Sequence, residues 1–199
     1  MNRSFTELNL EKLNKMSLSE KMKTIGIRQQ GDPILERVCQ QFILPSQQDT
    51  AKVVIKELQQ TIDIAQQIHN FSKGLGVAAP QIGLSWQAAI VMPLEEKPLI
   101  LLNPKIAFQS EKTDEQYEGC WSFFDVRGLV QRPLEIKISY QTLDGKKILA
   151  SFSHATARLI LHEFDHLQGI LYTDRMKPKQ KLLSYKEYKI KNQSWEYQK

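Results

Sequence analysis

The chain has few cysteines and no long apolar run. Only Cys39 and Cys120 occur among its 199 residues, which is too few for a disulfide framework. No apolar segment approaches the roughly 20 residues that a membrane-spanning helix requires. Residues 1–23 lack the apolar core of a secretory signal, and acidic residues interrupt them, unlike a transit peptide. We therefore expect a cytoplasmic protein with free thiols and no membrane contact.

The remaining composition is that of an ordinary globular protein. Apolar residues make up 41% of the chain and charged residues 25%, which excludes collagen-like and disordered classes. A chain of 199 residues can bury one sizeable core. We expect a polar, loosely attached N-terminal extension at residues 1–23, a domain at residues 24–176, and a basic, helical tail at residues 177–199.

Hydrophobic periodicity predicts both helices and strands. Between residues 50 and 71 apolar side chains recur every three or four positions, which indicates a helix with one buried face, capped by Asp49 or Thr50. β-like runs cover residues 88–92, 99–102, 134–140 and 147–152. Asp144-Gly145 predicts a hairpin turn between the last two runs. Ser153 can then cap a helix that continues through Leu167.

The last of these helices carries the pattern His162-Glu163-Phe164-Asp165-His166. Residues four apart lie on one helical face, so the two imidazoles can share one metal ion. In this HExxH pattern, Glu163 is placed to take a proton from a metal-bound water. The alternative is an exposed helical face that happens to carry histidines and acids. We expect an α+β fold of mostly antiparallel short sheets packed around this helix, with a further helix in the N-terminal half and one at the C-terminus.

A catalytic zinc-like site needs a third protein ligand beside an open position. Cys120 is the first candidate, because Gly119 before it allows close backbone approach. Taken alone, a free cysteine is more often a small buried packing residue, which is the role we expect for Cys39. Glu187 is a rival third ligand, as in zinc proteases that take a downstream glutamate.

Three separated segments resemble one family, the peptide deformylases. They are Gly74-Leu75-Gly76-Val77-Ala78-Ala79-Pro80-Gln81, Glu118-Gly119-Cys120-Trp121-Ser122, and the run from His162 to Gly169. Their order and intervals are similar to those of the family, and the resemblance covers residues 24–176. The joint match is far more specific than any one motif.

The resemblance implies a metal-dependent hydrolase that removes the formyl group from the N-terminal methionine of newly made peptides and releases formate. Cys120, His162 and His166 would hold one divalent ion, for which the family implies Fe²⁺, with Zn²⁺ or another divalent ion as the alternative. The ion and Glu163 would activate water, and Glu163 would return its proton to the leaving amine.

The same resemblance assigns roles around the metal. The side chain of Gln81 and the backbone N–H of Trp121 would hold the developing oxyanion. Gly76 would pair with the substrate backbone by strand addition. Leu75 and Val77 are candidates for the methionine pocket, with a plain core role as the alternative.

For Arg127, and for the pair Glu118 and Arg132, a role at the site and exposure to solvent remain alternatives. Arg127 could lie at the pocket rim or be an ordinary surface arginine. Glu118 and Arg132 could form an ion pair near the site or each face solvent.

Three positions depart from the family pattern. Trp121 replaces a leucine and could narrow the mouth of the site. Phe124 stands where proline is common. Leu161 replaces a glutamine before His162, which removes a polar group that could support the ligands.

Two rivals to the deformylase interpretation remain, a zinc peptidase that uses Glu187 and a non-catalytic paralogue that binds metal or peptide ends. The expected partners are N-formylmethionyl nascent peptides. Contact between the basic tail and the ribosome is a further hypothesis, with a solvated charged helix as its alternative. No sequence-specific nucleic-acid binding is expected.

Overall fold

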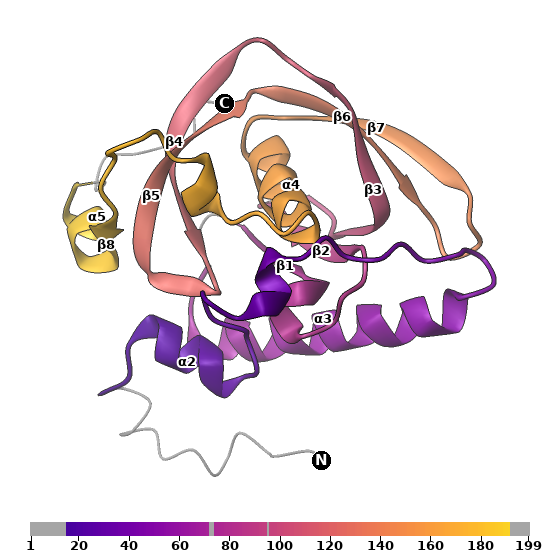
Figure 1. The fold of residues 1–199 in the computed structure, drawn as a ribbon, viewed down its shortest axis with the longest axis horizontal. Coiled ribbons are helices and arrows are strands. Elements are labelled where there is room, and N and C mark those ends of the chain that lie inside the picture. Colours follow the sequence, from indigo (N-terminus) through magenta and orange to yellow (C-terminus); the bar gives the residue numbers. More distant parts are fainter. Residues whose placement is uncertain (1–14, 72–73, 95, 192–199) are drawn as a thin grey trace.

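The computed structural model describes residues 15–71, 74–94 and 96–191 (Figure 1). Its helices are α2 Leu18–Thr24, α3 Gln48–Ile68, α4 His154–Leu167 and α5 Tyr185–Lys191, with 3-10 helices η2 Pro33–Glu36, η3 Ala79–Ile82 and η4 Tyr172–Arg175. Its strands are β1 Leu75–Ala78, β2 Ala88–Met92, β3 Leu99–Gln109, β4 Thr113–Cys120, β5 Phe123–Pro133, β6 Glu135–Gln141, β7 Lys147–Ser153 and β8 Leu183–Ser184.

The strands form two sheets. One has five strands in the order β1-β2-β3-β6-β7, and the other has three in the order β4-β5-β8. All pairings between these strands are antiparallel. The predicted runs at residues 88–92, 134–140 and 147–152 correspond to β2, β6 and β7, and the run at 99–102 is the start of the longer β3. The α+β class with antiparallel sheets is confirmed.

Helix α3 forms where the apolar period predicted it, and its inner face is buried in the core. The buried positions share one face of the helix: Ala51, Val54, Leu58, Ile62 and Ala65. The cap predicted at Asp49 or Thr50 is wrong, because the helix begins at Gln48 and Asp49 lies in its first turn, where a negative charge is favourable. Within the described part of the chain, none of the helices is both long enough and apolar enough to cross a membrane.

Helix α4 lies between the two sheets. It packs against β1, β2, β6 and β7 of the larger sheet and against β5 of the smaller one (Figure 1). Ser153 is the N-cap residue, as predicted, but its side chain makes no capping hydrogen bond. Gly169 follows the helix with φ of +72°, and a Cβ there would lie 2.7 Å from the carbonyl carbon of Glu36. Glycine is required at this position by both the left-handed conformation and the close approach.

Helix α2 belongs to a stretch that we expected to be loosely attached, and the structure shows otherwise. The hydroxyl of Ser17 accepts from the N–H of Glu20 at 3.2 Å, and the carboxylate of Glu20 accepts from the N–H of Ser17 at 2.7 Å. This capping box starts the helix. Met22 is fully buried in the core beside α3. The expected loose attachment is therefore wrong for α2, whereas residues 1–14 lie outside the described residues.

The C-terminal segment returns to the smaller sheet. Strand β8 pairs with β5, with Val126 opposite Ser184 and Arg127 opposite Leu183. Helix α5 follows directly and packs against β5 (Figure 1). Residues 192–199 of the predicted basic tail lie outside the described residues. The segment is thus placed beside β5, the strand that leads away from Cys120.

The burial of Met22 gives a test of the packing of α2. We expect Met22→Ala to lower the free energy of unfolding by about 2–5 kcal/mol, because it removes a fully buried side chain and leaves a cavity. Urea denaturation followed by circular dichroism measures this difference. Lys23→Ala, an exposed change on the same helix, should shift the free energy by less than about 0.5 kcal/mol. Equal effects of the two changes would show that α2 does not pack as described.

Candidate active site and metal centre

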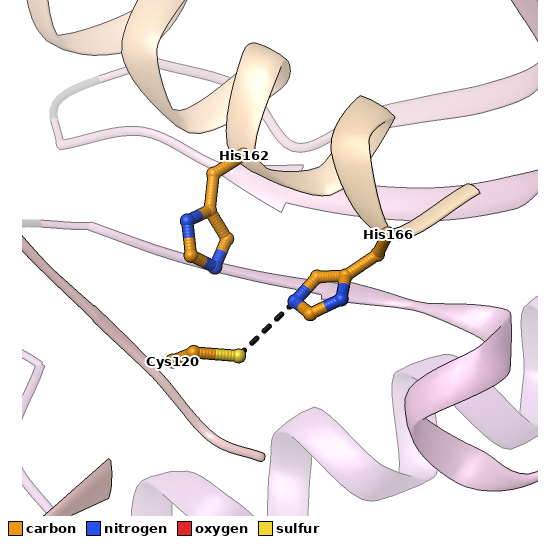
Figure 2. Close-up of side chains that lie close together, drawn as sticks. All are labelled: Cys120, His162 and His166. Atoms are coloured by element: carbon orange, nitrogen blue, oxygen red, sulfur yellow. Dashed lines mark hydrogen bonds between the residues drawn. The ribbon is translucent and has the colours of Figure 1, made fainter. Parts of the chain in front are cut away.

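Helix α4 and the end of β4 bring three potential metal ligands together. His162 and His166 project from one face of α4, and Cys120 points toward them from the end of β4 (Figure 2). Sγ of Cys120 lies 3.0 Å from Nε2 of His166, and one ligand atom from each residue lies within 4.8 Å of the others. All three sequence-predicted ligands therefore meet at one point. A thiolate and two imidazoles suit zinc or ferrous iron.

The surroundings of Cys120 favour its thiolate form. Burial alone would raise the pKa of the thiol, but the imidazoles of His166 and His162 hold it well below the usual value. Two further groups donate hydrogen bonds to the sulfur, the Nε2 amide of Gln81 at 3.3 Å and the N–H of Ser122 at 3.4 Å. The thiolate is the form in which cysteine binds a metal.

A buried carboxylate orients the first histidine. Oε2 of Glu118 lies 2.9 Å from Nδ1 of His162, which leaves Nε2 of that ring for a metal. Arg132 donates to both oxygens of Glu118 at 2.9 Å, and Arg158 donates to Oε1 at 2.7 Å. Burial raises the pKa of Glu118, yet Arg132 and His162 outweigh burial and hold the pKa far below its usual range. The ion pair of Glu118 with Arg132 is thus buried at the site rather than exposed to solvent.

The same network extends to the far end of α4. Nη1 of Arg132 donates to Asp165 at 2.5 Å, and Nη2 of Arg175 donates to the other oxygen of Asp165 at 2.6 Å. Arg158, Asp165 and Arg175 were not predicted from the sequence as members of this network. Arg158 precedes His162 by four residues and so lies on the same helical face, which was a usable indication. The contacts of Asp165 and Arg175 depend on the tertiary fold.

Glu163 is buried beside the ligands with an unused oxygen. Its side chain is 3% exposed, and Oε2 has no hydrogen-bond partner within the described residues. Burial, the largest cause, raises its pKa to about 7. A Cβ on Gly76 would lie 2.5 Å from Oε1 of Glu163, so only glycine lets β1 pass this close to the carboxylate. The arrangement leaves one carboxylate oxygen able to accept a proton.

Gln81 is held with its amide N–H₂ toward the cysteine. It lies in η3, and its Oε1 accepts from the N–H of Ala78 at 2.8 Å. Because the oxygen is fixed in this way, the Nε2 donors point to Cys120 and to the hydroxyl of Ser122. The side chain is therefore oriented as a hydrogen-bond donor beside the three ligands.

A cavity of about 200 Å³ opens beside these groups. Leu75, Gly76, Trp121 and Arg127 line it. Val77 does not line the cavity and is fully buried in the core instead. The predicted pocket role of Val77 is therefore not supported. Arg127 is 8% exposed, so the alternative of a surface arginine is wrong.

The three departures from the family pattern have different surroundings. Trp121 is buried against Phe71, with ring centroids 5.3 Å apart, and lines the cavity. Phe124 is buried and also lines the cavity. Leu161 packs in the hydrophobic core with Ile136 and Ala157, in a group of buried residues that does not include Cys120. Its apolar side chain therefore serves packing, and Glu118 supplies the polar support of His162 instead.

Glu187 lies apart from the ligands. It is exposed on α5, and its Oε2 accepts from the N–H of Ser184 at 2.8 Å and from its hydroxyl at 2.7 Å. Its carboxylate thereby caps the helix. Within the described part of the chain, the group of potential metal ligands consists of Cys120, His162 and His166. The Glu187 alternative is not favoured.

Known proteins share this arrangement of sequence and fold. The family profile of polypeptide deformylases matches residues 25–182. A peptide deformylase of Thermotoga neapolitana is 34% identical over 160 residues, which are 79% of this chain and 90% of the relative. The crystal structure of the Thermotoga maritima peptide deformylase superposes with a TM-score of 0.66 at 31% identity, covering 76% of this chain and 97% of the other.

A Met-Ala-Ser-bound structure of a class I type b peptide deformylase from Acinetobacter baumannii also matches, with a TM-score of 0.68 and 28% identity. It covers 75% of this chain and 96% of the other. The profile spans most of the chain, and the relatives are matched over nearly their whole length. The chain belongs to the polypeptide deformylase family.

Proposed function

We propose that this protein hydrolyses the N-formyl group from the N-terminal methionine of newly made peptides and releases formate. The family to which the chain belongs is metal-dependent and acts on the formyl amide of nascent peptides. The observation that carries the proposal is the buried cluster of Cys120, His162 and His166 with the unpartnered carboxylate of Glu163 beside it. The HExxH interpretation of α4 forms part of this proposal, as does a cytoplasmic location.

The three ligands would hold one divalent ion. We favour Fe²⁺ from the family resemblance, with Zn²⁺ or another divalent ion as the alternative, because a Cys-His-His set suits both. The donor set supports binding, since the low pKa of Cys120 provides a thiolate and Glu118 fixes the ring of His162. When bound, such an ion supplies Lewis-acid activation of water and of the formyl carbonyl.

Glu163 would move the proton. Its free Oε2 would accept a proton from the attacking water and later return it to the leaving amine of the peptide. A pKa of about 7, raised by burial, makes both protonation states accessible near neutral pH. One carboxylate can therefore act as base and then as acid.

Gln81, Trp121 and Gly76 would position the substrate. The Nε2 donors of Gln81, fixed by the N–H of Ala78, and the backbone N–H of Trp121 would stabilise charge on the formyl oxygen. β1 is the edge strand of the larger sheet, so its outer backbone groups, including those of Gly76, can pair with an extended peptide. Leu75 would contact the methionine side chain at the cavity wall.

Metal content tests the proposed ligands. We expect Cys120→Ala to weaken divalent metal binding by roughly 100-fold or more, because a direct ligand is lost and the loss of a mere supporting group already costs 10–100-fold. The metal-to-protein ratio after anaerobic loading and dialysis measures this. Cys39→Ala, which removes the other buried cysteine, and Glu187→Ala should keep full metal. Loss of metal in Glu187→Ala with retention in Cys120→Ala would instead support the peptidase alternative.

Formate release tests catalysis. With a formyl-Met peptide and anaerobic, iron-loaded protein, we expect Glu163→Gln to reduce kcat/KM by about 10²–10⁴-fold while metal content is unchanged. The amide keeps the size of the side chain but cannot accept the proton. Absence of turnover in the wild type would refute the deformylase proposal and favour a non-catalytic paralogue. Unchanged turnover in Glu163→Gln would remove Glu163 from the mechanism.

We further propose that the basic tail, residues 177–199, contacts the ribosome, where phosphates attract lysine-rich surfaces. We expect Lys186→Glu with Lys191→Glu, both exposed on α5, to weaken co-sedimentation with ribosomes, and added salt to weaken it in the wild type. Lys105→Glu on β3 is the control for a charge change elsewhere. Co-sedimentation that is absent, or that salt leaves unchanged, would contradict the contact.

A further inference from the structure

Arg127 is a buried cation to which the described residues supply no acidic partner. Its Nη1 donates to two backbone carbonyls, those of Phe124 at 2.8 Å and Val126 at 2.7 Å. Among the residues that the structure describes, no carboxylate lies within ion-pair distance of its guanidinium, and Nε and Nη2 have no hydrogen-bond partner. Burial of a charge is costly unless an opposite charge or several hydrogen bonds compensate it. Neither Nε nor Nη2 is a fully buried atom, so both donors retain some access to solvent beside the cavity that Arg127 lines.

Aromatic rings surround this guanidinium. Its central carbon lies 4.9 Å from the ring of Phe124, 4.7 Å from that of Tyr185 and 5.8 Å from that of Tyr188. Tyr185 and Tyr188 belong to α5, which lies beyond the family match that ends at residue 182. Strand β8 fixes the position of α5, because it pairs with β5 at Arg127 itself. Rings around a cation favour the charge and exclude water from it.

The cavity beside the metal ligands extends to this group. Cys120, Glu163 and Gly76 line it, and so do Arg127, Tyr185 and Tyr188. Gly119, next to Cys120, lets the guanidinium of Arg127 lie close to the β4 backbone, because a Cβ at this position would overlap the guanidinium. A peptide whose first residue is held at the ligands and at β1 can therefore direct its following residues toward Arg127.

The local charges are favourable to an anion. His69 lines the same end of the cavity, and its pKa is lowered first by burial and then by the cations Arg127, Lys189 and Lys21. The buried carboxylate of Glu118, which also lines the cavity, is already bound by two arginines. The thiolate of Cys120 also acts on Arg127 and favours its charged form, but among the described residues no carboxylate of the cavity wall forms an ion pair with the guanidinium.

We propose that Arg127, with the rings of Tyr185 and Tyr188, forms a carboxylate-binding subsite that selects formyl peptides carrying a carboxylate shortly after the first residue. The inference rests on the proposed deformylase function. The carboxylate comes either from an acidic side chain or from the free C-terminus of a short peptide, because both present the same two oxygens to a guanidinium. The C-terminal segment would in this way set substrate preference.

Paired substrates test the subsite and identify the source of the carboxylate. One pair is formyl-Met-Ala-Glu-amide with formyl-Met-Ala-Gln-amide, and the other is formyl-Met-Ala with a free or an amidated C-terminus. We expect kcat/KM of the wild-type, iron-loaded protein to be about tenfold higher for the charged member of at least one pair. Equal values in both pairs, with normal turnover of the neutral peptides, would overturn the subsite and leave the proposed function standing.

Measurements of peptide affinity test the carboxylate-binding subsite independently of catalysis. In at least one of the two pairs, the metal-loaded Glu163→Gln protein should bind the charged deformylated peptide about tenfold more tightly than the neutral one, measured by calorimetry. Equal affinities would overturn the subsite even if no peptide is turned over. A clear preference in binding without any turnover would support the subsite and refute the deformylase function.

Variants locate the preference. Arg127→Gln should reduce the charged-to-neutral ratio to about one, whereas Arg37→Gln, the same change at an exposed arginine, should preserve it. Tyr185→Ala exposes the guanidinium to water and should lower the ratio severalfold, because solvent weakens the charge interaction. A cooperative unfolding transition confirms that each variant is folded. A full preference in folded Arg127→Gln, or in Tyr185→Ala if Arg127→Gln does not fold, would contradict the assignment.

Discussion

The buried carboxylate of Glu118 connects the parts of the site. It lies on β4 and accepts hydrogen bonds from Arg132 on β5 and from Arg158 on α4, while Nδ1 of His162 lies 2.9 Å away. A carboxylate in this position would be strongly destabilising if any of these partners were missing, because an unpaired buried charge costs several kcal/mol. The position of α4 relative to the β4–β5 hairpin is therefore tied to the orientation of the imidazole of His162, on which the proposed mechanism depends.

Two glutamates close together have opposite properties because their surroundings differ. Arginines surround Glu118 and keep it ionised, so it serves only to orient its partners. Glu163 has no arginine bound to it among the described residues, and burial raises its pKa to about 7. Environments that separate two carboxylates in this way assign a fixed charge to one and proton transfer to the other. The difference in pKa between the two glutamates thus depends on where the fold places its arginines.

Local sequence pattern predicted the elements whose cause is local. The helix around Leu58 followed from its apolar period, and the relation of His162 to His166 followed from helical spacing. The strands β1, β4 and β5 were not predicted, because glycines and polar residues interrupt their alternation. Val77 and Arg127 were considered for the substrate pocket because they lie beside family-like motifs in the sequence. Val77 is covered by the core formed with α3 and β2, and the burial of Arg127 depends on α5, which is distant in sequence from β5.

The resemblance to peptide deformylases indicated the roles of Cys120 and Gln81, which hydrophobic periodicity and helical spacing alone could not. Cys120 as third ligand and the orientation of Gln81 both need contacts between segments far apart in the chain. The role of Arg158 was within reach, since it lies one turn before His162, but its partners on β4 were not. Long-range ion pairs are the part of this site that a single sequence does not reveal.

X-ray absorption spectroscopy of the anaerobic, metal-loaded protein tests the central claim most directly, because it reports the atoms bound to the ion. With zinc as the loaded ion, we expect one sulfur at about 2.3 Å and two imidazole nitrogens at about 2.0–2.1 Å. A shell of nitrogen and oxygen without sulfur would exclude Cys120 as a ligand and contradict the site described.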